Sequence, residues 1–200
     1  MPEATTALRK AVKYGVEKAH YAVRNDDGTY GAPKPLLGAV SVTVDPEGES
    51  NPFYADNSIY FDEETNAGYT GKFEVAYLED EARADLLGEI IDAIGGIYDD
   101  ADASGSHVAF MWQTNGNVRN KRVVYYDVSF KRPSEADQTK NEKTDPGTFE
   151  LEFTAVPVEI EVGDRTSKTS KYSLPSDKAE AKAAYDKWFE AVAMPQAAAA

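Results

Sequence analysis

The chain has 200 residues, which suits one domain with extended arms. It contains no cysteine, which excludes a disulfide scaffold, a thiolate metal site and a cysteine nucleophile. Its net charge of −14 argues against a protein that wraps nucleic acid, because an acidic surface repels phosphates.

The charge is unevenly distributed along the chain. Residues 35–117 carry 17 acidic and two basic side chains, whereas residues 1–34 carry six basic and four acidic ones. General solubility is one explanation of such an acidic block. The other is that the acidic surface of one copy meets the basic arm of the next, or lines a shared cavity.

The termini and apolar runs indicate where the protein is found. No apolar run approaches the roughly 20 residues that span a bilayer. The first residues lack the apolar core of a signal peptide. We therefore expect a soluble protein of a reducing cytoplasm, without membrane contact.

The first quarter of the chain predicts an arm followed by a strand. Residues 1–24 are expected to form an extended or irregular N-terminal arm, and Asp27-Gly28 predicts a turn. Residues 36–44 predict a strand, because valines alternate with small residues there.

Residues 45–71 form the longest ambiguous region. Two short aromatic runs, at residues 53–54 and 59–61, flank Asp56-Asn57. The pattern predicts either a hairpin or an extended excursion from the domain.

A strand and a helix follow. Residues 72–78 alternate as a strand, and acidic residues 79–81 suit the first turn of a helix. An apolar stripe predicts that this flanking helix continues to Ile94, where Gly95-Gly96 ends it.

Two more strands and a loop occupy the middle of the chain. Residues 107–113 predict a strand with Val108, Phe110 and Trp112 facing inward. Residues 122–130 predict a second strand, with Val124, Tyr126, Val128 and Phe130 on one side. Residues 131–147 are polar and predict a long flexible loop.

The last quarter contains a change of phase and an amphipathic segment. Apolar residues are odd-numbered before Val156-Pro157 and even-numbered after it, which predicts a strand that leaves one sheet and joins another. A last strand is expected over residues 168–174. Residues 176–193 predict a C-terminal helix with Ser176 as N-cap, packed on the domain's own core or, alternatively, on another subunit.

Strands dominate and do not alternate with helices, so the predicted class is mainly β with α (α+β). We expect one domain over residues 1–200. Its predicted form is a β-sandwich or partly open barrel with a flanking helix and a C-terminal helix.

No group of residues predicts catalysis. Asp99, Asp100 and Asp102 lack the later glutamate of a calcium loop and suit a solvated acidic turn. The two histidines, His20 and His107, have no partner that the sequence brings near them. We expect no catalytic residue, metal or cofactor, and thus no enzyme.

Aromatic and basic side chains instead predict a subunit interface. The aromatic candidates lie in an acidic region without a clear core face, which favours burial against another chain. They are Tyr54, Tyr60, Phe61 and Tyr69. The basic candidates lie in the predicted arm and are Arg9, Lys10 and Lys13.

Several segments, taken in order, resemble a known family. They are KYGV at 13–16, HYA at 20–22, LLGAVSVTVDPEGE at 36–49, FYADNSIYF at 53–61, NAGYTG at 66–71, FEVAYL at 73–78, DLLG at 85–88 and YDKWF at 185–189. Their order and spacing resemble the major tail protein, or tail tube protein, of long, non-contractile-tailed bacteriophages.

The resemblance implies a structural virion protein, made in the host cytoplasm, whose six-membered rings stack into a tube for genome delivery. It implies a β-sandwich subunit, one sheet of which joins a barrel around the lumen. Implied partners are further copies of the chain and the tape measure, tail terminator and distal tail proteins. Viral DNA would pass through the lumen without sequence-specific binding, and a negative lumen would repel its phosphates.

Two alternatives remain open. One is the inner-tube protein of a contractile injection device, and the other is a stand-alone adhesive or carbohydrate-binding β-sandwich, which would usually be exported. Under the tail tube hypothesis, residues 45–71 are expected to stack on the neighbouring ring.

Overall fold

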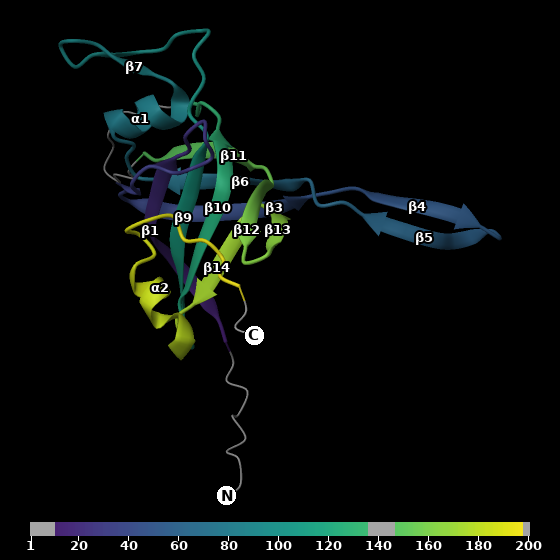
Figure 1. The fold of residues 1–200 in the computed structure, drawn as a ribbon. Helices are drawn as coiled ribbons and strands as arrows, with labels where there is room; N and C mark the ends of the chain where they lie inside the picture. Colours follow the sequence, from purple (N-terminus) through teal and green to yellow (C-terminus); the bar gives the residue numbers. More distant parts are fainter. Residues whose placement is uncertain (1–10, 136–146, 198–200) are drawn as a thin grey trace, which may run out of the picture.

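A computed structural model describes residues 11–135 and 147–197 (Figure 1). The predicted class is confirmed in its main feature, because strands make up 51% of the described residues and helices 9%. None of the helices in the described part of the chain is long and apolar enough to cross a membrane.

The main sheet is antiparallel and has eight strands in the order β2-β1-β9-β10-β11-β6-β3, with β14 also pairing with β10. Its strands are β1 (Lys13–Val23), β2 (Lys34–Leu36), β3 (Ala39–Glu47), β6 (Gly68–Val75), β9 (Val108–Gly116), β10 (Lys121–Phe130), β11 (Phe149–Ala155) and β14 (Lys171–Pro175).

Three two-stranded sheets and three helical segments complete the described part of the chain. The small sheets are β4 (Ser50–Ala55) with β5 (Ser58–Glu64), β7 (Ile90–Ile91) with β8 (Ile97–Tyr98), and β12 (Val158–Val162) with β13 (Arg165–Thr169). The helical segments are α1 (Asp80–Leu87), the 3₁₀ turn η1 (Ala179–Ala181) and α2 (Lys182–Asp186).

The prediction of an extended or irregular arm over residues 1–24 is wrong for residues 13–23, which form β1 within the main sheet. This strand pairs with β9 along its length, but the register shifts twice, and Lys18 adopts a positive φ of 53°. Each shift breaks the alternation by which a strand is recognised in a sequence. Residues 1–10 lie outside the described residues.

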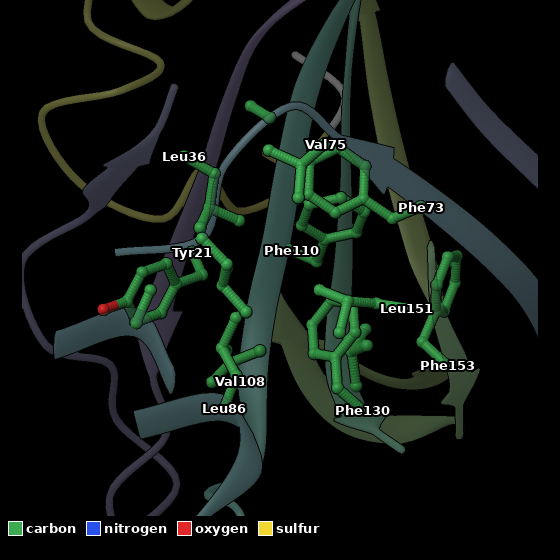
Figure 2. Packing of buried hydrophobic residues seen from close by; sticks show 14 of the residues in the cluster. Tyr21, Leu36, Phe73, Val75, Leu86, Val108, Phe110, Phe130, Leu151 and Phe153 are labelled. Carbon is green, nitrogen blue, oxygen red and sulfur yellow. The ribbon is translucent and has the colours of Figure 1, made fainter. Parts of the chain in front are cut away.

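Side chains of the central strands enter two apolar clusters. In β9, Val108, Phe110 and Trp112 belong to the larger cluster, as predicted, while Ala109 and Met111 belong to the smaller one. Figure 2 shows part of the larger cluster, where side chains from β6, β9, β10 and β11 meet. Because both faces of β9 are covered, six consecutive residues of it are buried.

The predicted single inward face of β10 is wrong. Val124 and Tyr126 pack in the smaller cluster, whereas Val128 and Phe130 pack in the larger one. The register of β10 against β9 shifts between Tyr125 and Val128. At the same place the pairing partner on the other edge of β10 changes from β14 to β11. The two halves of β10 therefore contribute side chains to different apolar clusters.

The predicted change of phase at Val156-Pro157 is confirmed. Leu151 and Phe153 of β11 lie in the larger cluster, and Val158 of β12 lies in the smaller one. Strand β11 ends at Ala155, where the chain leaves the main sheet, and β12 then pairs with β13 in a separate sheet. The predicted last strand, residues 168–174, is divided between β13 and β14, with the buried Ser170 between them.

The predicted extent of the flanking helix is wrong, since α1 ends at Leu87 and not at Ile94. Gly88 stops the helix in the left-handed conformation, with φ of 72°, and its N–H bonds to the carbonyl of Ala84. Ile94 lies beyond the helix and is 94% exposed.

The predicted C-terminal helix over residues 176–193 is also wrong in extent, because only η1 and α2 are helical. Ser176 is not an N-cap: its Oγ accepts a hydrogen bond from the N–H of Asn120. The expected packing on the domain's own core is nevertheless confirmed, because Trp188 is 1% exposed in the smaller cluster.

Arg122 ties the C-terminal segment to the sheet. Its guanidinium donates to the carbonyl of Tyr185 and, over 3.0 Å, to Oε1 of Gln113. The same group lies 4.0 Å from the centre of the Tyr185 ring and 4.8 Å from that of Phe189. A buried cation with these partners fixes where the C-terminal segment lies.

We expect Arg122→Met to lower the free energy of unfolding by about 1.5–3 kcal/mol, the usual value of hydrogen bonds to a charged group. Urea unfolding of the monomer measures the change. The control is Arg119→Met, which removes an exposed pair with Asp177 and should cost less than about 1 kcal/mol. Equal losses in the two variants would contradict the assignment.

Candidate functional site

The hairpin β4–β5, called here the aromatic hairpin, continues the β3–β6 ribbon beyond the main sheet (Figure 1). The β3–β6 ladder ends at the pair Glu47 and Gly68. Backbone hydrogen bonds from Ala67 to Glu47 and from Thr65 to Glu49 then join the two chains of the neck. The hairpin is therefore anchored to the sheet at its base.

Two features of the sequence determine how this segment folds. A Cβ atom at Gly48 would lie 2.0 Å from the carbonyl oxygen of Thr65, so only glycine allows the neck to close. At the tip, Asp56 and Asn57 have φ of 49° and 60°. Two positive φ values define the two-residue turn that suits the twist of a hairpin.

The projecting segment is shorter than the predicted one, residues 45–71. Residues 45–47 belong to β3 and residues 68–71 to β6, so the excursion covers residues 48–67. Of the two forms that the sequence left open, the structure has the hairpin.

The aromatic hairpin exposes large apolar side chains from both strands. Phe53 and Tyr54 are consecutive in β4, where the pairing with β5 shifts register, and they are 60% and 64% exposed. In β5, Tyr60 is 72% exposed, and Ile59 and Phe61 are similarly open. The Phe53 and Tyr60 rings meet edge to face at 6.5 Å, which orders the surface without burying it.

None of these five side chains belongs to either apolar cluster. A two-stranded hairpin alone in water is marginally stable at best, and contiguous exposed apolar surface commonly marks an interaction site. The chemistry that the aromatic hairpin offers is therefore binding, through desolvation of its aromatic rings.

The charge of the aromatic hairpin has one sign. Residues 48–67 contain no lysine or arginine, and Glu49, Asp56 and Asp62 are exposed. Asp62 accepts a hydrogen bond from Ser50 Oγ over 2.6 Å across the two strands. A partner surface would thus be apolar and basic.

The structure brings Tyr54, Tyr60 and Phe61 together on the hairpin but places Tyr69 elsewhere. Tyr69 lies in β6, partly buried against the larger cluster, with its ring 5.2 Å from that of Tyr125. Lys171 Nζ lies 4.3 Å from the centre of the same ring. Tyr69 therefore packs on the domain's own core.

Of the basic candidates, Lys13 is the first residue of β1 and lines a groove between β1 and β3. Arg9 and Lys10 lie outside the described residues. The sequence did not single out Arg119, Lys121 and Lys171, which line the same groove. They come from separate parts of the chain, and only the sheet order brings them together.

The two histidines lie in different surroundings. His20 stacks on Phe189 with ring centres 4.4 Å apart, and burial lowers its pKa. His107 Nδ1 makes a hydrogen bond to Asp127 Oδ1, and Arg24 lies 3.8 Å from the other oxygen of that carboxylate. Within residues 11–135 and 147–197, no three His, Asp or Glu side chains are grouped as a metal site would require.

The acidic turn that contains Asp99, Asp100 and Asp102 is held by an arginine. Arg132 donates to the carbonyls of Asp100 and Ala103 and pairs with the Asp99 carboxylate at 3.5 Å. Asp100 also accepts the N–H of Asp102, as in an Asx turn. The guanidinium therefore offsets one of the three negative charges in this turn.

No protein-family model matches this chain, and no curated protein matches its sequence.

Proposed function

We propose that this protein is a tail tube protein, which assembles with copies of itself into stacked, six-membered rings that form a conduit for viral DNA. The observation that carries the proposal is the aromatic hairpin. Five large apolar side chains are exposed on a ribbon that leaves the domain and contributes to neither cluster.

The form of the main sheet also supports the proposal. Its terminal strand β3 approaches β1, with Cα atoms within 8 Å, although no ladder joins the two strands. A sheet that curls in this way suits the partly open barrel or sandwich expected of a tail tube subunit. The role proposed is structural and needs no catalytic residue.

Assembly requires two complementary surfaces on each copy, because a contact between unlike surfaces propagates when it does not close into a ring. The hairpin is apolar and acidic and supplies one of them. The proposed partners are further copies of this chain and the proteins that begin, measure and end a tail. Viral DNA is proposed to pass without sequence-specific contacts, since repelled phosphates do not adhere to an acidic wall.

The purified chain is expected to form rings or tubes as its concentration rises, because association of identical subunits follows mass action. Negative-stain microscopy and light scattering over a range of concentrations measure this. Ordered tubes of constant width support the proposal. A protein that keeps the 21.9 kDa mass of one chain at every concentration and ionic strength would contradict it.

A further inference from the structure

The groove between β1 and β3, called here the basic groove, has a volume of about 650 Å³. Val16, Val42 and Trp112 contribute apolar side chains to its lining. The volume lies within the range of 300–1,000 Å³ that is usual for sites that bury a ligand the size of a few side chains. The groove can thus receive aromatic rings.

The charged residues in the lining of the basic groove are all cationic. They are Lys13, Arg119, Lys121 and Lys171, and none of the aspartates or glutamates that the structure describes lines the groove. Arg119 pairs with Asp177, and Lys171 lies over the Tyr69 ring. Lys13 and Lys121 have no carboxylate within ion-pair distance in the described part of the chain, which leaves two lysines for a partner.

The spacing of the groove walls determines what can enter. An added strand between β1 and β3 would need about 9.6 Å, twice the usual distance between paired strands. The two strands already approach to Cα distances within 8 Å. Where the two strands approach this closely, an inserted strand does not fit, and the groove can take only side chains.

We propose that the basic groove receives the aromatic hairpin of a second copy of this chain. This inference rests on the tail tube proposal and names the surface that accepts the hairpin. The hairpin presents aromatic rings with Asp56 and Asp62, and the groove presents apolar walls with Lys13 and Lys121. Opposite charges around an apolar contact set the orientation and exclude wrong partners.

The occupant comes from another copy because the geometry of one chain directs the hairpin away. Val40, Val42 and Val44 of β3 line the groove, and β3 then continues through Glu47 to the hairpin neck. In Figure 1 the hairpin projects outward from the end of β3, away from β1. Hairpin and groove are thus separate surfaces of one subunit, and their contact propagates from copy to copy.

Three double variants test the inference. The groove variant is Lys13→Glu/Lys121→Glu, and the hairpin variant is Tyr54→Ser/Tyr60→Ser. The matched control, Lys178→Glu/Lys187→Glu, makes the same change of charge at exposed lysines outside the groove. The groove and hairpin variants are each expected to raise the concentration at which tubes appear by at least about tenfold, because like charges or lost aromatic contacts oppose docking. The control should assemble as the unmodified chain does.

Mixing the groove and hairpin variants distinguishes this contact from a general loss of assembly. In the mixture only one hairpin–groove contact remains possible, between the intact hairpin of the groove variant and the intact groove of the hairpin variant. The mixture should therefore contain a particle whose mass equals the sum of the masses of the particles that the two variants form alone. It should contain no tubes. A mixture without such a species, or a groove variant that assembles like the control, would overturn the inference.

Cross-linking of the unmodified protein needs no variant. A carbodiimide joins lysines to carboxylates in contact, so tubes should yield peptides that link Lys13 or Lys121 to Glu49, Asp56 or Asp62, and monomers should not. Links from these lysines to Glu3 instead would identify residues 1–10 as the occupant and overturn the inference. Tubes without the expected links overturn only the groove assignment, whereas a chain that forms no tubes overturns the tail tube proposal as well.

Discussion

Replacement of residues 48–67 by Asn-Gly is expected to abolish tube formation and to leave a folded monomer. The replacement joins Glu47 to Gly68 through a two-residue turn, and these two residues already face each other at the end of the β3–β6 ladder. Asn-Gly suits a two-residue hairpin turn, so β3 and β6 can keep their register. Microscopy at concentrations where the unmodified chain forms tubes gives the result.

The monomer should survive because the removed segment contributes to neither cluster. For a chain of this size, a change of about 1 kcal/mol shifts Tm by about 2–4 °C, so Tm should stay within that interval. Normal tubes from the shortened chain would show that the aromatic hairpin is not needed for assembly. A large loss of Tm would show instead that the hairpin supports the fold.

Phe110→Ala is expected to lower the free energy of unfolding by about 3–5 kcal/mol, the usual cost of removing a buried phenylalanine. The Phe110 ring is fully buried and lies at the centre of the larger cluster (Figure 2). Four rings surround it at centre distances of 5.0 to 5.6 Å, those of Phe73, Trp112, Phe130 and Phe153. The strands that carry these rings cannot move inward to fill the cavity that the variant leaves, because hydrogen bonds to neighbouring strands hold each of them.

The measurement is urea unfolding of the monomer followed by tryptophan fluorescence, since Trp112 lies beside the deleted ring. The control is Phe61→Ala on the aromatic hairpin, where the side chain is 58% exposed. It should change the free energy of unfolding by less than about 0.5 kcal/mol. Similar values for both variants would contradict the assignment of Phe110 to the core.

Regular alternation made part of this fold predictable. Val108, Phe110 and Trp112 identified β9, and the change of phase at residues 156–157 located the exit of the chain from the main sheet. Asp56-Asn57 between aromatic runs allowed a hairpin. In each case the deciding interactions lie within a few residues of one another in the sequence.

Interactions between distant parts of the chain caused most of the failures, and a local change of backbone conformation at Gly88 caused another. Register shifts against β9 concealed β1, and the left-handed Gly88 ended α1 although apolar residues continue beyond it. The C-terminal stripe has helical spacing, but its residues are held by partners on the sheet, such as Arg122. The spacing of apolar residues reveals none of these three effects, because it reports neither the backbone conformation of single residues nor tertiary contacts.

The aromatic hairpin and the basic groove differ in how far the sequence predicts them. The aromatic hairpin could be anticipated, because it is one continuous segment rich in exposed ring side chains. The basic groove could not, because its cations are distributed between Lys13 and Lys171 and meet only through the order β1-β9-β10-β14.

The unbroken path from β3 and β6 into the hairpin has a mechanical consequence. Antiparallel hydrogen bonds run perpendicular to their strands, so a pull along the hairpin axis loads the bonds of the β6–β11 ladder in shear, all at once. A pull across the strands would instead open them one after another. The hairpin is therefore oriented so that the main sheet resists a pull on it along its axis.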